Sequence, residues 1–360
     1  MSDSVVPGLG AGGQVLHGRL RAGYAALAAG RPEEAARASR EVLAIDQNSV
    51  PAHFLVGLVS LAVDDRATAL SAFGSVTRLE PRHAAAWAQL ARLFVRAGQP
   101  NRADQALAEA VANAPEEPMV LDLIGTVFSQ LGDQASARDW YSRAVALAPD
   151  NAAFRVNLAS SCVFLGELDQ AQRILERLLG QHPDIAQAHW LLASARKATD
   201  RTHVEVLVNQ VARGHRTGHD FAFLYYALGK ELEDLQEWDR AFAAFSRGAK
   251  ARRATLTYDE ETEAAAYAAA ARLFTREWLA AQAAGAEDAS PIFVVGLPRT
   301  GTTLVERIIT SHSQVRSAGE LQQFGLSIRR QLDEAVPGRF SAALLERAAT
   351  VDVRAVGDSY

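Results

Sequence analysis

The sequence predicts a mainly α-helical protein: a superhelix of stacked helix pairs over residues 16–255, then the first portion of an α/β domain over residues 290–360. Two observations predict the helix pairs. Prolines recur every 34 residues, and glycines and alanines keep the same period. A third observation, a β-branched and aromatic run followed by a glycine-bounded loop, predicts the α/β segment. Residues 256–289 are expected to form a helical linker between the two.

The composition is that of a folded chain with more than one domain. Its 360 residues are 49% hydrophobic and 22% charged, which excludes a disordered or collagen-like chain. The net charge of −5 gives no basis for binding nucleic acid or an anionic membrane surface. We therefore expect neither as a partner.

Targeting and metal signals are weak. The apolar stretch from Val50 to Val63 is too short to span a bilayer, and the start of the chain has no secretory pattern, so we expect a soluble, cytoplasmic protein. The single cysteine, Cys162, excludes a disulfide framework and a four-cysteine zinc site. His215 and His219 lack an evident third ligand, so we expect no metal.

The repeat has a fixed set of marker residues. The prolines stand 34 residues apart, at Pro81, Pro115, Pro149 and Pro183. Glycines on the same period are Gly30, Gly98, Gly132 and Gly166, while Asp64 takes the glycine position of the second repeat. An alanine follows five residues later, at Ala35, Ala69, Ala103, Ala137 and Ala171. This pattern predicts a helix, a tight turn, a second helix that approaches the first closely, and a proline that ends the unit.

This pattern resembles the tetratricopeptide repeat in period, turn, alanine and terminal proline. The resemblance places repeats at 16–49, 50–83, 84–117, 118–151 and 152–185, a degenerate one near 186 and a last one near 222. Arrays of this kind bind a protein or peptide in their inner groove. Asn157 stands where some arrays hold a carboxylate, but Leu20 and Leu191 replace the expected basic companions. We therefore favour an Asn157 that caps or bridges neighbouring helices.

A new domain is predicted to begin near Pro291. The run Ile292–Val295 predicts a buried parallel strand, and Ser313–Ala318 a second one. Between them, the loop Gly296–Thr303 leads into a helix. Such an arrangement aims backbone N–H groups and a helix dipole at an anion, usually a phosphate.

The loop chemistry indicates a compact anionic ligand. Gly296 and Gly301 have the spacing of a nucleotide-triphosphate loop, but Thr302 replaces its lysine, which argues against an ATP-dependent kinase. Arg299 supplies a planar guanidinium suited to oxyanions, and Thr300 and Thr303 add hydroxyl donors.

The run Pro-x-Arg-[Ser/Thr]-Gly-Thr-Thr-Leu after a strand resembles the 5′-phosphosulfate loop of sulfotransferases, closest to the tyrosylprotein branch, in an α/β domain with a P-loop-like start. The whole chain is similar to bacterial proteins that join tetratricopeptide repeats to a sulfotransferase domain. The resemblance implies the donor 3′-phosphoadenosine 5′-phosphosulfate, with no metal. It implies that the donor is surrounded by Arg299, Thr300, Gly301, Thr302 and Thr303.

The same resemblance assigns catalysis to Glu320 and Arg299. Glu320 follows Gly319 and lies 21 residues after Arg299, so the resemblance makes it the base that takes the acceptor hydroxyl proton, with Arg299 stabilising the leaving phosphate. The alternative for Glu320 is an acid facing a helix dipole. The acceptor, by analogy, is a protein tyrosine, with a sugar, lipid or small-molecule hydroxyl left open.

A second hypothesis concerns the extent of the domain. The family's 3′-phosphate clamp is expected past Tyr360, so we expect the sequence to stop in mid-domain and the 360-residue chain to be inactive alone. The alternative function is therefore a tetratricopeptide interaction scaffold with an incomplete, non-catalytic nucleotide-binding fold.

Overall fold

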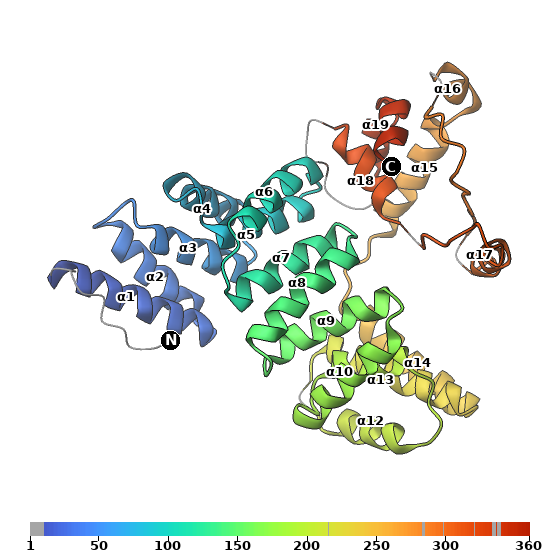
Figure 1. Ribbon diagram of the computed structural model, residues 1–360, viewed down its shortest axis with the longest axis horizontal. Helices are drawn as coiled ribbons and strands as arrows, with labels where there is room; N and C mark the ends of the chain where they lie inside the picture. Colours follow the sequence, from blue (N-terminus) through green and yellow to red (C-terminus); the bar gives the residue numbers. More distant parts are fainter. Residues whose placement is uncertain are drawn as a thin grey trace. The chain divides into compact units, whose positions relative to one another are not determined.

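The computed structural model describes residues 11–214, 216–282, 285–297, 299–319, 321–332, 336 and 340–360. Every regular element within these ranges is an α-helix, which confirms the predicted mainly α class (Figure 1). The chain divides into two units. The first extends to Tyr258 and contains α1–α14 apart from the short segment Ala97–Pro100, and the second contains α15–α20.

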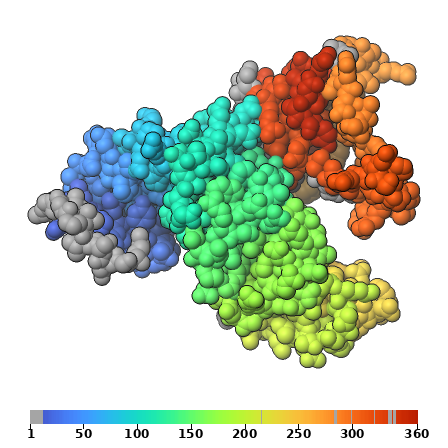
Figure 2. Space-filling view, in the orientation of Figure 1, coloured from blue at the N-terminus to red at the C-terminus, as the bar shows by residue number. Residues whose placement is uncertain are grey.

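The first unit is a series of helix pairs. Its helices are α1 (Ala11–Ala28), α2 (Pro32–Leu43), α3 (Val50–Ala62), α4 (Arg66–Leu79), α5 (Ala84–Arg96), α6 (Pro100–Ala112), α7 (Pro118–Gln130), α8 (Gln134–Leu147), α9 (Ala152–Phe164), α10 (Leu168–Gln181), α11 (Ala186–Ala195), α12 (Thr202–Ala212), α13 (Gly218–Asp234) and α14 (Trp238–Arg253). The first helices of successive pairs also contact one another, as α5 does with α7 and α7 with α9. Each pair therefore packs on the next, and in the space-filling view the colours of this unit follow one another in sequence order (Figure 2).

The turns inside the pairs use a left-handed residue. Gly30, Gly98, Gly132 and Gly166 all have φ between 71° and 87°, which confirms the four predicted glycine turns. The same conformation is taken by Asp64 (φ 57°) and Gln236 (φ 63°), where the repeat has lost its glycine. A side chain in this region is strained, so these two turns store free energy that a glycine would not.

The two helices of a pair touch through small residues. The five period alanines are fully buried. A second small position on the first helix lies opposite a large residue 16 positions later: a Cβ added to Gly57 would lie 2.5 Å from the ring of Phe73. Gly125 meets Tyr141 in the same way. The helix spacing is therefore set by the sum of two side-chain volumes.

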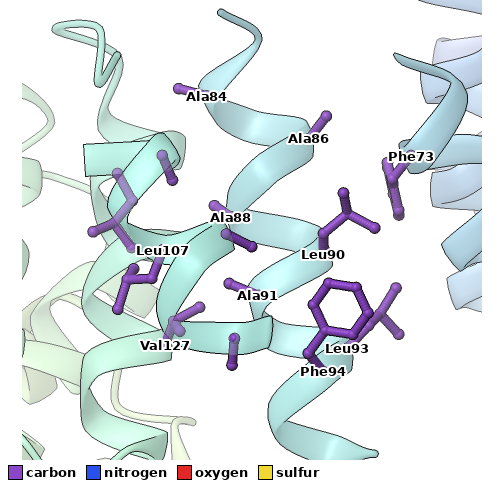
Figure 3. Packing of buried hydrophobic residues seen from close by; sticks show 14 of the residues in the cluster. Phe73, Ala84, Ala86, Ala88, Leu90, Ala91, Leu93, Phe94, Leu107 and Val127 are labelled. Carbon is purple, nitrogen blue, oxygen red and sulfur yellow. The ribbon is translucent and has the colours of Figure 1, made fainter. Parts of the chain in front are cut away.

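The core between pairs is aliphatic and aromatic. Around α5, Figure 3 shows Leu90, Leu93 and Phe94 with neighbours from other helices, Phe73 and Leu107. These side chains belong to one buried cluster that extends from Ala69 to Leu131. No helix in the described ranges is long and apolar enough to cross a membrane.

The second unit contains shorter helices. They are α15 (Glu260–Leu273), α16 (Arg276–Ala281), α17 (Thr302–Thr310), α18 (Gln323–Arg330), α19 (Ala342–Ala348) and α20 (Val353–Ser359). Helix α15 packs on α19, with Ala266 and Leu344 buried, and the Trp278 indole N–H donates to the carbonyl of Ala349 at 2.9 Å. The α15–α16 segment thus contacts later helices of its own unit.

The two predicted strands are not formed in the described residues. Ile292–Val295 and residues 315–319 lack regular secondary structure, and Ser313 lies in a turn after α17. Ile292, Phe293 and Val295 are 59%, 65% and 86% exposed. A parallel strand persists only when neighbouring strands and covering helices satisfy its backbone and bury its side chains. The sequence pattern identified a strand-forming segment, but no described segment pairs with it.

Candidate functional site

The loop before α17 is tightly wound. A Cβ on Gly296 would lie 2.8 Å from Oγ1 of Thr300 and 3.0 Å from Cγ2 of Thr302, so only glycine fits there without a shift. The Thr300 hydroxyl donates to the carbonyl of Leu297 at 2.7 Å, and the Thr300 N–H donates to the same oxygen at 3.2 Å. The loop therefore folds back on itself over a few residues.

Two left-handed residues complete this turn. Arg299 has φ 68°, a strained value for a side-chain-bearing residue, and Gly301 has φ 96°. Strain of this kind costs about 1–3 kcal/mol and is concentrated at functional turns. Gly301 caps α17, so the chain enters the helix directly from the turn.

The start of α17 can accept an anion. Within the described residues, Gly301 provides no side-chain cap and the first turn contains no acid. The first backbone N–H groups of a helix have no intrahelical acceptor and lie at the positive end of its dipole. These donors, from Thr302 onward, are the ones that hold phosphate or sulfate at helix N-termini.

The side chains of the loop add charge and hydroxyl groups. Arg299, Thr300 and Thr303 are exposed, and Thr302 is half-buried. Arg299 forms no ion pair with any residue the structure describes. The Thr300 hydroxyl already donates to the Leu297 carbonyl. One guanidinium, the hydroxyls of Thr302 and Thr303 and a helix N-terminus therefore share one short loop, and this donor set fits a compact oxyanion.

The predicted base, Glu320, lies outside the described residues. The segment that precedes it is tied to α17: the Ser317 hydroxyl donates to Glu306 and accepts the N–H of Gly319 at 3.1 Å. Gly319 has φ 70°. The contact between Glu306 and Ser317 was not predicted, because no sequence pattern relates two residues 11 positions apart in different segments.

The first helices of the repeats present a second set of polar groups. The Asn157 amide on α9 donates to Asp122 on α7 at 2.9 Å, which confirms the predicted bridging role. Burial raises the pKa of Asp122, and the Asn157 hydrogen bond opposes this. On α5, burial and the nearby Arg96 lower the pKa of Arg92, whose Nε has no described hydrogen-bond partner. The first helices α5, α7 and α9 therefore carry polar and charged side chains.

Other candidate groups behave as structural residues. Cys162 is fully buried, and burial raises its pKa to about 11, so it is a poor nucleophile. Within the described ranges no group of three or more His, Cys, Asp and Glu is arranged to hold a metal, and His215 falls outside those ranges.

Comparison with known families agrees with both units. The tetratricopeptide repeat profile matches residues 60–125 and 130–195. The sulfotransferase family profile matches residues 291–353, which include the loop and α17. The chain therefore contains tetratricopeptide repeats and a C-terminal segment that matches the sulfotransferase family.

Individual relatives cover the repeats. An uncharacterized protein of Aquifex aeolicus is 28% identical over 216 residues, covering 59% of this chain and 28% of that protein. Anaphase-promoting complex subunit 3 of Schizosaccharomyces pombe is 26% identical over 159 residues, covering 44% and 24%. The chain thus spans about a quarter of the length of these curated relatives. Among solved structures, the human IFIT1 dimer with m7Gppp-AAAA is 16% identical, covers 73% of this chain and 64% of that chain, and has a TM-score of 0.54. That likeness concerns the helical-repeat fold alone.

Proposed function

We propose that the C-terminal segment takes part in sulfuryl transfer from 3′-phosphoadenosine 5′-phosphosulfate to an acceptor hydroxyl. Arg299, Thr300, Gly301, Thr302 and Thr303 would hold the 5′-phosphosulfate. The observation that carries the proposal is the Gly301-capped start of α17, free of acids in its first turn, inside the segment that matches the sulfotransferase family.

The reaction assigns one role to each side chain. The acceptor O–H gives its proton to Glu320 while its oxygen bonds to sulfur, and the bond between sulfur and the 5′-phosphate oxygen breaks. Negative charge then develops on the departing phosphate. Arg299 and the first N–H groups of α17 stabilise this charge, as preorganised donors do in other group-transfer enzymes.

The repeats would recruit the acceptor or a partner. Tetratricopeptide arrays bind proteins or peptides, and this array carries polar groups on its first helices. An acceptor tyrosine in a bound protein is the candidate that fits both units. We further propose that the repeat array (16–255), the helical linker (256–289) and the sulfotransferase segment (290–360) are separate regions of the chain.

The test is donor binding measured by calorimetry with adenosine 3′,5′-bisphosphate and with ATP. A charged hydrogen bond is worth about 1.5–3 kcal/mol, so Arg299→Ala should weaken bisphosphate binding by roughly 10–150-fold. Arg276→Ala, an exposed arginine on α16, serves as the matched control and should bind normally. Equal affinities of wild type and Arg299→Ala would exclude this loop as the phosphate site. A wild-type chain that binds neither adenosine 3′,5′-bisphosphate nor ATP would favour the interaction scaffold instead.

A further inference from the structure

A chain of buried titratable groups joins α11, α12 and α13. His189, His203 and Glu231 are 1%, 7% and 0% exposed. His189 Nε2 lies 2.9 Å from the carbonyl oxygen of Pro183, and His189 Nδ1 lies 2.9 Å from His203 Nε2. His203 Nδ1 lies 2.7 Å from Oε1 of Glu231. Three helices thus meet through one continuous hydrogen-bond chain.

The hydrogen-bond partners determine which ring nitrogens carry protons. A carbonyl oxygen only accepts, so His189 donates from Nε2 and, when neutral, accepts at Nδ1. His203 Nε2 must then donate to His189. At the other ring nitrogen, His203 Nδ1 faces a carboxylate oxygen, and two lone pairs at this distance would repel. The contact is attractive only if one proton lies between them, on His203 or on Glu231.

Glu231 lies among charged groups of α13 and of the loop between α11 and α12. Arg196 Nη2 donates to Oε1 of Glu231 at 3.3 Å, whereas Oε2 has no described partner. Lys230 and Asp234, on the same helix as Glu231, pair with each other and are directed at the α11–α12 loop: Lys230 donates to the Arg196 carbonyl, and Asp234 accepts the Ala198 N–H at 2.8 Å.

The His189 end faces a second group of charges. Arg216 donates to the carbonyl of Asp184, and both charged groups act on His189. Burial lowers the pKa of His189 to about 4; the hydrogen bond to the Pro183 carbonyl opposes this, and the nearby His203 and Arg216 add to the lowering. His189 is therefore neutral near pH 7, and its Nδ1 can accept the hydrogen bond from His203.

We propose that these residues form a proton-dependent clasp that holds α12 against α11 and α13 and releases it in alkaline solution. In an opened α12, a free histidine and a free glutamate bind no proton above about pH 7. The closed clasp binds one. Closing therefore takes up a proton, so the closed state loses stability as the pH rises.

The test is amide hydrogen exchange of α12 in the full chain, between about pH 7 and 9. One linked proton makes the opening constant rise about tenfold per pH unit, so α12 protection, corrected for the chemical exchange rate, should fall by that factor. Helix α8 in the same sample should keep a constant protection. In Glu231→Gln, the amide can donate to a neutral His203 Nδ1 without any shared proton, so the pH dependence should disappear. Glu233→Gln, an exposed acid on the same helix, should keep it.

A second measurement does not depend on the variant folding. Histidine ring ¹⁵N spectra of the wild-type chain at pH 7 should report His189 protonated at Nε2 alone. They should also report His203 protonated at both nitrogens, or at Nε2 with a protonated Glu231 carboxyl. A His203 with a bare Nδ1 facing an ionised Glu231 would overturn the proposal. Equal pH profiles in wild type and Glu231→Gln would overturn it as well.

Discussion

The spacing of each helix pair depends on a matched pair of residues, and this can be tested at Gly57 and Phe73. A methyl group added at Gly57 would lie 2.5, 2.6 and 2.9 Å from three ring carbons of Phe73, closer than carbon atoms approach. Phe73 is fully buried, so its ring has no free space to enter. We expect Gly57→Ala to destabilise the array.

The magnitude follows from two opposing effects. Overpacking a core costs about 1–3 kcal/mol. Replacing glycine by alanine inside a helix stabilises the folded state by about 1 kcal/mol. The net loss should be about 1–2 kcal/mol, since the clash involves a ring rather than a flexible chain end. Gly74→Ala, in α4 with nothing within 4 Å of its new Cβ, isolates the helix-propensity gain and should stabilise by about 0.5–1 kcal/mol.

The repeats themselves supply the compensating change. Where the first helix has alanine in place of this glycine, at Ala91 and Ala159, the second helix has leucine, at Leu107 and Leu175. Phe73→Leu alone should leave a cavity and cost about 1–2 kcal/mol, less than a full truncation to alanine. In the double variant Gly57→Ala with Phe73→Leu the two defects should cancel, with a favourable coupling of about 1–3 kcal/mol.

Urea unfolding followed by circular dichroism measures this cycle, with the slope checked in each variant. Strict additivity of the two substitutions, within about 0.5 kcal/mol, would refute the volume argument. So would a Gly57→Ala variant that is as stable as Gly74→Ala.

Three further predictions concern single residues. Glu320→Gln should leave adenosine 3′,5′-bisphosphate affinity nearly intact but lower sulfate transfer by about 10²–10⁴-fold in a protein that shows the activity; wild-type turnover would remove Glu320 from the mechanism. Gln236→Gly should raise stability by about 0.5–1 kcal/mol, because the residue has φ 63°, and an unchanged melting temperature would contradict this. The pKa of His189 is lowered to about 4 in the folded chain, so the unfolded chain binds more protons between about pH 4 and 6.5. Stability should therefore fall by up to about 3 kcal/mol as the pH drops through that window, and this fall should vanish in His189→Gln but persist in His17→Gln, a change at an exposed histidine.

The repeat fold could be predicted because its determinants are local and repeated. Gly30 and Ala35 specify a turn and a close helix contact within one pair, and the same residue types return 34 positions later. The strand at Ile292–Val295 could not be settled in this way. Its residues have the right chemistry, but a strand exists only through hydrogen bonds to another segment, and a local pattern does not say whether that segment is there.

The loop of the candidate site shows the same division. Its composition can be interpreted from the sequence, since Arg299 and the threonines of the loop Gly296–Thr303 indicate an oxyanion site. The contacts that hold the segment after α17 could not be predicted. The hydrogen bonds from Ser317 to Glu306 and from Gly319 to Ser317 join residues that no repeat or motif relates. Short-range chemistry was predictable here, and long-range positioning was not.

The clasp lies where the repeat pattern fails, and this has a physical reason. In a regular pair, a glycine turn and an alanine contact hold the two helices together. Between α11 and α12 no left-handed glycine occurs, and Arg196–Arg201 connects the helices without one. Lys230 and Asp234 of α13 hydrogen-bond to that connection instead, and Glu231 of α13 contacts His203 on α12. Buried polar contacts thus add to the apolar cluster that these three helices share, which includes Ala193, Val204 and Leu224. Because polar contacts depend on protonation and apolar contacts do not, this pair is the part of the array whose stability should follow pH.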